Sequence, residues 1–230
     1  MRYVAGYSAK YRPDQTKCLS PVTLKERDMS TVKFFFEFSS PYSYIASLQI
    51  DAVAIEAGRS VEWCPIELGA VWQAHGVLDA YRQIRRLKAP YIYRDAARIA
   101  KMQGITLAVP ATKTPPPNTA LAKLAYWGLY QSDPDRAKQF VQMVWHRYFD
   151  EGKPIESLND LARAAQAIGV DAQTIKAASM QAAARSAQDA SNQAAVHSGC
   201  FGVPWFIADD DCFFGQDRLP HIAAYLANVK

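Results

Sequence analysis

Three short segments carry residues whose types and positions could do chemistry, and the first is Phe38-Ser-Ser-Pro-Tyr-Ser-Tyr44. Ser40 is a favourable N-cap and Pro41 a favourable first helical residue, so Ser40 would stand at the start of a helix. Backbone N–H groups at a helix start favour an anion such as a thiolate, and a serine hydroxyl can donate a hydrogen bond to it. The alternative interpretation is that Ser40 only caps the helix.

The other two segments lie near the C-terminus. Gly202-Val203-Pro204 precedes strand-forming residues, and a proline is tolerated at the start of a strand because no ladder hydrogen bond needs its nitrogen. An ordinary trans bond before Pro204 is the simplest interpretation. Gly215-Gln-Asp-Arg218 opens a predicted helix, where Asp217 could bind a cationic amino group and neighbouring N–H groups a carboxylate. That pair of charges is what a γ-glutamyl group presents, although Asp217 could equally be an N-cap.

The elements that would position these segments follow an α/β order. Phenylalanines alternate in Thr31–Phe38 and predict a strand, and residues 61–66 predict a second one. Between them, helical spacing relates the apolar residues Ile45, Leu48, Ala52 and Ile55, and Gly58 ends the helix. Helices are then expected near residues 90–103, 118–131, 134–149, 157–168, 172–182 and 185–198. Residues 201–208 and 212–214 predict a hairpin with a turn at 209–211, and residues 219–227 a last helix.

This order, βαβ, a helical block and ββα, predicts a thioredoxin-like α/β fold with a large inserted all-helical domain. We assign residues 30–74 and 184–230 to the thioredoxin-like domain and residues 75–183 to the insertion. Residues 1–29 lack periodicity, and we expect a disordered extension or a misassigned start there. The alternative is a tail that packs on the body or on a partner chain.

Composition narrows the functional classes. The chain has 230 residues, 50% of them hydrophobic, which can form a sizeable core without metal or disulfide staples. A net charge of +4 without a dense basic block gives no indication of nucleic-acid binding. Apolar runs long enough to span a membrane and a signal-peptide pattern are both missing, so we expect a cytoplasmic protein. The four cysteines show neither CxxC nor metal-ligand spacing, so we expect thiols and no metal site.

Together, the motifs resemble the 2-hydroxychromene-2-carboxylate isomerases and the related kappa-class glutathione transferases. The resemblance covers about residues 32–226 and rests on the order of motifs at residues 36–44, 91–95, 117–119, 201–204 and 215–219. It implies glutathione as the cofactor, with Ser40 contacting its sulfur. It implies a cis bond before Pro204 and backbone contacts from Val203 to the cysteinyl part. The glutathione-binding residues that it implies are Lys88, Val203, Pro204, Gln216, Asp217 and Arg218.

One part of the chain departs from the family pattern. Residues 75–80 replace a stretch in which the family carries a glutathione-binding asparagine, and His75 or Asp79 could substitute for it. Without the family, Lys88 would simply be one member of a solvated basic face with Arg82, Arg85 and Arg86.

The resemblance implies a glutathione-dependent isomerase that interconverts 2-hydroxychromene-2-carboxylate and trans-o-hydroxybenzylidenepyruvate by reversible thiolate addition, as in aromatic catabolism. A small aromatic carboxylate would be the substrate, and the protein would be a homodimer. A kappa-like transferase or peroxidase is one alternative, and a non-catalytic thioredoxin-like binding module is another. A dithiol oxidoreductase is disfavoured because residues 40–43 contain no cysteine.

Overall fold

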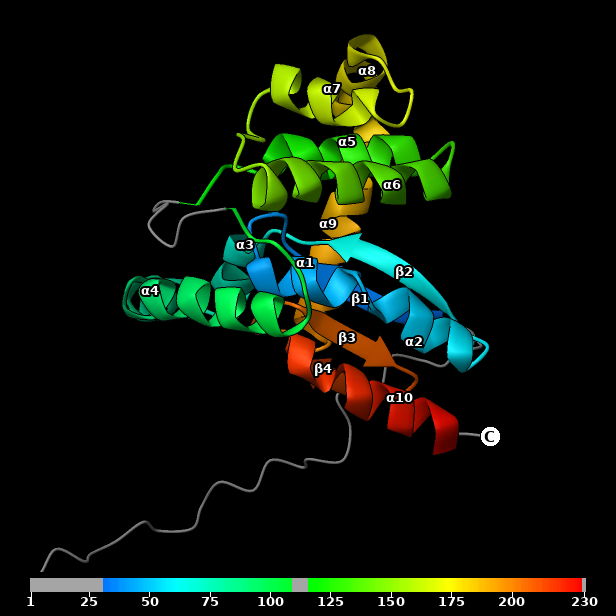
Figure 1. Cartoon of the computed structure of the whole chain (residues 1–230). Coiled ribbons are helices and arrows are strands. Elements are labelled where there is room, and N and C mark those ends of the chain that lie inside the picture. The colour runs from blue at the N-terminus through cyan, green and yellow to red at the C-terminus, as the bar shows by residue number, and fades with distance from the viewer. Residues whose placement is uncertain (1–30, 109–115, 229–230) are drawn as a thin grey trace, which may run out of the picture.

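The computed structural model describes residues 31–108 and 116–228, so the expectation for residues 1–29 lies outside the described part. Its sheet has the strand order β2-β1-β3-β4. The strands are β1 (Thr31–Phe36), β2 (Ser60–Pro65), β3 (Trp205–Ala208) and β4 (Asp211–Phe214). β1 runs parallel to β2 and antiparallel to β3, and β4 is antiparallel to β3 (Figure 1). The predicted thioredoxin-like α/β fold class is confirmed.

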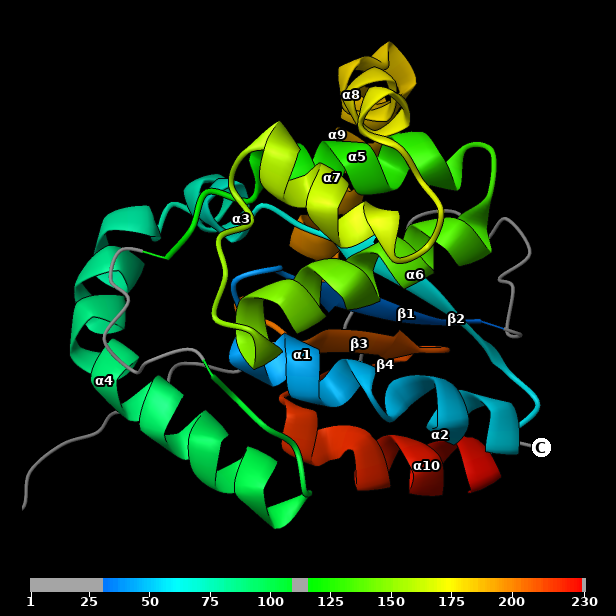
Figure 2. The ribbon, with the colours of Figure 1, turned by 45° about the horizontal axis from the view of Figure 1, so that its top comes forward.

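Helices surround this sheet and make up most of the described chain. The first are α1 (Pro41–Ser47), α2 (Ile50–Glu56), α3 (Leu68–Ala74) and α4 (Leu78–Met102). The middle of the chain forms α5 (Ala120–Tyr130), α6 (Pro134–Trp145), the π-helix η1 (His146–Asp150), α7 (Leu158–Gln166), α8 (Ala172–Met180) and α9 (Ala182–His197). After the hairpin, the 3-10 helix η2 (Gln216–Arg218) leads into α10 (Leu219–Asn228). Figure 2 shows α1, α2 and α10 together on one side of the sheet.

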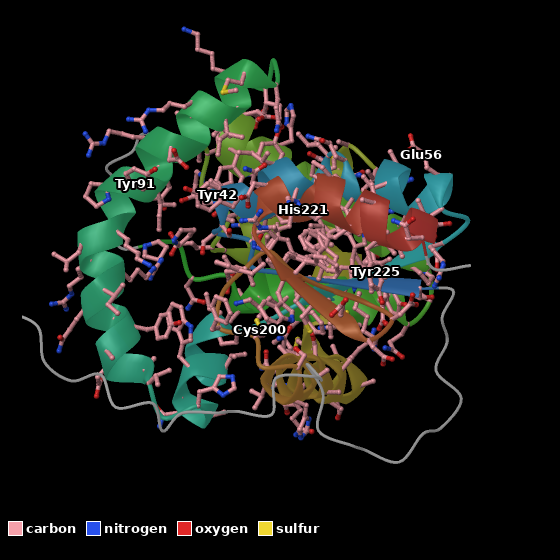
Figure 3. All side chains as sticks on the ribbon, turned by 90° about the horizontal axis from the view of Figure 1, so that it is seen from below. Tyr42, Glu56, Tyr91, Cys200, His221 and Tyr225 are labelled. Atoms are coloured by element: carbon pink, nitrogen blue, oxygen red, sulfur yellow. The ribbon has the colours of Figure 1, made fainter. Side chains whose placement is uncertain are left out.

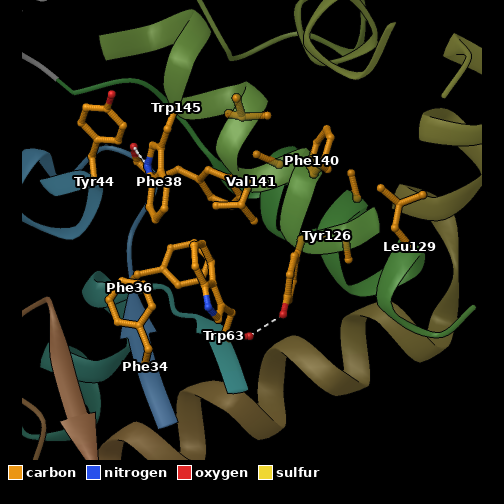
Figure 4. Packing of buried hydrophobic residues seen from close by; sticks show 14 of the residues in the cluster. Phe34, Phe36, Phe38, Tyr44, Trp63, Tyr126, Leu129, Phe140, Val141 and Trp145 are labelled. Atoms are coloured by element: carbon orange, nitrogen blue, oxygen red, sulfur yellow. Dashed lines mark hydrogen bonds between the residues drawn. The ribbon is translucent and has the colours of Figure 1, made fainter. Parts of the chain in front are cut away.

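The alternating phenylalanines of β1 explain how both faces of the sheet are covered. Phe34 and Phe36 are fully buried in the large core cluster, together with Trp63 and with residues of α1, α2, α5, α6 and α10. Trp145 closes this cluster and donates a hydrogen bond to the carbonyl of Phe38 at 3.0 Å (Figure 4). On the other face, Phe35 packs in a second cluster with residues of α3 and α9. Burying each such aromatic side chain contributes about 1.5–3 kcal/mol.

The helix predicted to end at Gly58 is divided into two, and this changes which residues are buried. α1 ends at Ser47 and α2 starts at Ile50, so the helical phase shifts between them. Leu48 and Ile55 are therefore 49% and 70% exposed, and the single apolar face predicted for this segment is wrong. The predicted stop at Gly58 is confirmed, because its φ of +69° is a left-handed conformation suited to glycine.

α4 begins well before the predicted residue 90, and α3 precedes it where no helix was predicted. Pro90 lies inside α4, although it provides no N–H for the helical ladder. Packing beyond the helix accounts for this, since Tyr81 of α4 stacks on Trp72 of α3 with ring centroids 4.8 Å apart. Figure 2 shows α4 curving around the body, as a helix with an internal proline does.

The cysteines of the described residues differ in state. Cys64 and Cys200 are buried free thiols, whereas Cys212 is disulfide-bonded, so the expectation of a thiol is wrong for Cys212. Within residues 31–108 and 116–228, no helix has the length and apolar character that crossing a membrane would require.

Candidate functional site

Ser40 is held at the junction between β1 and α1. Its N–H donates to the carbonyl of Glu37 at 2.9 Å, which closes a tight turn after the strand. Its hydroxyl oxygen accepts from the N–H of Ser43 at 3.1 Å, so the predicted N-cap is confirmed. Among the described residues the hydroxyl hydrogen of Ser40 has no acceptor, and the side chain is half-buried. Ser40 therefore caps α1 and still has a hydrogen to donate.

A cis peptide bond links Val203 to Pro204, as the family resemblance implied. The pairing of Phe35 with Trp205 brings the chain before β3 alongside the chain after β1, which is where Ser40 lies. Val203 is only 9% exposed, and its backbone N–H and C=O groups form no backbone hydrogen bond within the described residues. Buried backbone groups are rarely left unpaired, so this position suits a ligand with a peptide backbone.

The 3-10 helix η2 joins the same region. The N–H of Gly215 donates to the carbonyl of Pro204 at 3.0 Å. Gly215 has a φ of +108°, and a Cβ there would lie 2.5 Å from Oδ1 of Asp217, so only glycine suits this turn. Asp217 lies inside η2, directly before α10, and pairs with Arg218 at 3.3 Å. Gln216 is half-buried and Arg218 is exposed.

α4 is fastened to α1 two residues beyond Ser40. The hydroxyl of Tyr42 donates to Asp95 at 2.9 Å, and the hydroxyl of Tyr91 donates to the same carboxylate at 3.3 Å. Burial and this hydrogen bond raise the pKa of Tyr42, and the nearby charge of Asp217 adds to the effect. Figure 3 places Tyr42 between the body and α4, which carries Tyr91. The start of α1, η2 and the middle of α4 therefore meet in one region.

The other residues that sequence analysis named as glutathione-binding candidates, Lys88, His75 and Asp79, have no contact with the Ser40 turn among the described residues. Lys88 is exposed on α4 and forms no ion pair with a described residue. His75 lies 3.0 Å from the carbonyl of Cys200, and Asp79 pairs with Arg82 at 3.2 Å. The described residues contain no group of three or more His, Cys, Asp or Glu side chains arranged to hold a metal ion.

Sequence analysis missed a buried ionic network directly behind Ser40. Lys123 of α5 is 2.8 Å from Glu37 and 2.6 Å from Glu67, and its side chain is only 2% exposed. Thr119 donates a short hydrogen bond to Glu37. Burial alone would lower the pKa of Lys123, but the two carboxylates raise it above its ordinary value. The network links the turn that holds Ser40 to α3 and α5.

The fold defines a thioredoxin-like protein, and the turn between β1 and α1 carries Ser40 and no cysteine. A family model described as a DSBA-like thioredoxin domain matches residues 31–227, and the chain belongs to that family.

Named relatives narrow the class. A 2-hydroxychromene-2-carboxylate isomerase of Sphingobium xenophagum is 28% identical, with 85% of this chain and 97% of that protein covered. A glutathione S-transferase kappa 2 of Caenorhabditis elegans is also 28% identical, with 85% and 91% covered. A solved structure of a 2-hydroxychromene-2-carboxylate isomerase superposes with a TM-score of 0.74 at 25% identity, covering 86% of this chain and 95% of the other. These relatives support an isomerase-like or glutathione-transferase-like enzyme.

Proposed function

We propose that the protein is a glutathione-dependent isomerase that interconverts 2-hydroxychromene-2-carboxylate and trans-o-hydroxybenzylidenepyruvate. The observation that carries the proposal concerns two neighbouring segments. Among the described residues the hydroxyl hydrogen of Ser40 has no acceptor, and Val203, in the segment that the pairing of β1 with β3 brings alongside, forms no backbone hydrogen bond. The isomerase relatives, similar over most of their length, support the same reaction.

Each residue of the site has a role in this proposal. Ser40 donates a hydrogen bond to the sulfur, and the backbone N–H groups at the start of α1 favour the thiolate form. Val203 pairs through its backbone with the cysteinyl part, next to cis-Pro204. When bound, glutathione supplies the nucleophile that makes reversible addition to the double bond possible.

The two ends of glutathione carry charges that other elements match. Gln216, Asp217 and Arg218 of η2 bind the γ-glutamyl end, since Asp217 suits its ammonium group and Arg218 its carboxylate. Lys88 of α4 is exposed, and its ammonium group would pair with a carboxylate of the same ligand.

The first test is calorimetric titration of reduced glutathione into the protein and its Ser40→Ala variant, followed by an isomerase assay. Losing one oxyanion-type donor costs about 100-fold to 1000-fold in turnover. Ser40→Asp separates the two roles of this residue, because aspartate is a good N-cap and donates no hydrogen at neutral pH. Ser39→Ala is the matched control in the same turn. Full turnover in Ser40→Ala would refute the assignment, and no saturable binding by the parent protein would refute the cofactor.

A kappa-like glutathione transferase is the second candidate, and the Caenorhabditis elegans relative favours it. Conjugation of a model electrophile without isomerase turnover would select it. We further propose the two-part organisation, residues 30–74 with 184–230 and residues 75–183, together with a cytoplasmic homodimer.

A further inference from the structure

Side chains hold the segment that leads into Val203. Residues 198–204 join the end of α9 to the start of β3, and Figure 3 shows Cys200 between α9 and the strands of the hairpin. Three consecutive carbonyl groups of this segment each accept one hydrogen bond from a side chain, namely those of Cys200, Phe201 and Gly202. A few individual donors therefore position the segment, and each of them can be removed on its own.

Two of these donors come from α3. The indole N–H of Trp72 donates to the carbonyl of Phe201 at 2.9 Å. Nε2 of His75 lies 3.0 Å from the carbonyl of Cys200, and because a carbonyl can only accept, this nitrogen carries the hydrogen. The third donor is the thiol of Cys200 itself, 3.3 Å from the carbonyl of Gly202. α3 therefore supplies both donors that come from outside the segment.

The end of α3 that carries these donors is itself fixed. Trp72 is only 9% exposed, and its ring stacks on Tyr81 of α4 with the ring planes 17° apart. His75 is the C-cap of α3, and its N–H donates to the carbonyl of Val71 at 3.1 Å. A donor that is already ordered loses little freedom when it forms a hydrogen bond, so both side chains are suited to holding another segment in place.

These hydrogen bonds leave one carbonyl of the segment for a ligand. The carbonyl of Pro204 accepts from the N–H of Gly215 at 3.0 Å. Within residues 200–204, only the carbonyl of Val203 thus has no partner among the described residues. A ligand with a peptide backbone therefore meets a single free acceptor, and the occupied carbonyls determine where along the segment it can pair.

We propose that Trp72 and His75 are positioning residues for glutathione binding. By occupying two carbonyls just before Val203, they hold its backbone where it pairs with the cysteinyl part of glutathione. This inference rests on the proposed function, in which Val203 makes that contact. It assigns His75 to the protein segment and not to the ligand, although His75 begins the stretch in which the family carries a glutathione-binding asparagine. We call the two hydrogen bonds the α3 clamp.

The test removes one donor at a time. Trp72→Phe keeps an aromatic ring against Tyr81 but has no N–H, and His75→Leu removes the other donor, whereas His75→Gln keeps an amide that can donate. The control Trp127→Phe removes an indole N–H of the same kind, which is bonded to Gln188 of α9 at 3.1 Å. Calorimetry measures the affinity for reduced glutathione and for S-methylglutathione, which keeps the peptide backbone but has no thiol.

A second readout needs no ligand. Cys200 is buried inside the clamped segment, and Cys64 is buried in β2. Iodoacetamide labelling followed by peptide mass spectrometry separates two kinds of opening, because local opening of the segment exposes only Cys200 and global unfolding exposes both thiols. Urea unfolding measures the stability of every variant.

We expect Trp72→Phe to weaken the binding of glutathione and of S-methylglutathione about 3-fold to 10-fold, the effect of one lost hydrogen bond. His75 is exposed, so His75→Leu should weaken both about threefold, and His75→Gln should restore them. KM for glutathione should rise, while kcat at saturating glutathione changes less than about twofold because Ser40 keeps its contacts.

Labelling should report the same clamp. In Trp72→Phe, Cys200 should react about 3-fold to 10-fold faster than in the parent protein, and the rate for Cys64 should not change. Trp127→Phe should alter neither the relative labelling of the two thiols nor the glutathione affinity, even where it lowers stability.

Four outcomes would count against the proposal or its basis. Unchanged glutathione affinity in both Trp72→Phe and His75→Leu would refute the α3 clamp, and an equal loss in Trp127→Phe would reduce its effect to stability. Weaker glutathione binding in His75→Leu with unchanged labelling of Cys200 would assign His75 to a direct ligand contact. If the parent protein binds no glutathione, the proposed function fails, whereas faster labelling of Cys200 in Trp72→Phe would still establish that the clamp holds the segment.

Discussion

Lys123 provides the most direct test of the structural argument, because it is the buried cation that neutralises the Glu37 carboxylate. Lys123→Met keeps the length and apolar stem of the side chain but removes the charge. The carboxylate of Glu37 is 11% exposed and keeps only the hydrogen bond from Thr119, whereas Glu67 is 48% exposed and can turn to solvent. Breaking a buried pair in this way costs about 3–5 kcal/mol of unfolding free energy.

The loss of unfolding free energy in Lys123→Met comes from the unpaired Glu37 carboxylate and not from Glu67. A set of variants can establish this. Glu67→Gln should cost less than about 1 kcal/mol, because that pair is screened by water. Glu37→Gln/Lys123→Met should be more stable than Lys123→Met, with a coupling energy of about 2 kcal/mol, because it leaves no buried charge alone. Urea unfolding followed by tryptophan fluorescence and circular dichroism measures the parent protein, the double variant and the three single variants Lys123→Met, Glu37→Gln and Glu67→Gln.

The pH dependence gives an independent check on the same pair. The pKa of Lys123 is raised above its ordinary value of 10.5, so its contribution is present below that value and is lost only as pH rises through the raised pKa. The cost of Lys123→Met should therefore be constant across neutral pH and shrink as pH rises through the raised pKa of Lys123. A cost below about 1 kcal/mol, or additive effects in the double variant, would refute a buried charge pair at this position.

Two further predictions concern other titratable groups. Burial alone would raise the pKa of Asp160, but hydrogen bonds from Ser157 and the nearby Arg147 lower it below 3.8. Asp160→Asn should lower the unfolding free energy by about 2 kcal/mol at neutral pH, and this loss should fade as pH drops through the lowered pKa. Urea unfolding at several pH values measures it, and a loss that does not change with pH would contradict the pairing. Burial raises the pKa of the Cys200 thiol to about 12, so iodoacetamide should label it only after unfolding; rapid labelling of the native protein would contradict its burial.

The elements predicted correctly are those governed by neighbours in the sequence. The alternation of phenylalanines determines β1, and the Ser40-Pro41 pair determines where α1 begins. Both rules act over a few residues, so no knowledge of the rest of the fold is needed. The hairpin of β3 and β4 follows the same logic, with Asp209 at a φ of +52° in its turn. Its predicted bounds are wrong at two places, because β3 begins at Trp205 and Asp211 pairs with Ala208 as part of β4.

The elements missed are those that depend on distant contacts. The helix predicted near residues 90–103 begins earlier, at Leu78, and Pro90 lies inside it although a proline usually marks the start of a helix or its end. Its place inside α4 depends on Tyr81, which stacks on a tryptophan of α3, and on Tyr42, which bonds to Asp95. Neither contact can be deduced from the local sequence around residue 90.

The ionic network did leave a signal in the sequence, but its partners could not be read there. Glu37 interrupts a run of phenylalanines, and Lys123 is the only charged residue in the apolar segment 120–130. A lone charge in such a segment indicates a buried group that needs a counter-ion. Thr119, which also bonds to Glu37, is 82 residues away from it along the chain, and Lys123 lies four residues further on. Only the folded topology brings these positions together.

The two interpretations of Ser40 that the sequence left open are compatible in one geometry. A hydroxyl has two acceptor lone pairs and one hydrogen, and the cap uses only one lone pair, through the N–H of Ser43. The turn to Glu37 fixes the backbone of Ser40, so the oxygen is held while the hydrogen can rotate toward a ligand. A donor that is already positioned loses little freedom on binding, so capping prepares Ser40 for the role that we propose. Glu37 belongs to this turn through its carbonyl and to the buried ionic network through its carboxylate, so the network helps to hold the backbone of Ser40 in place.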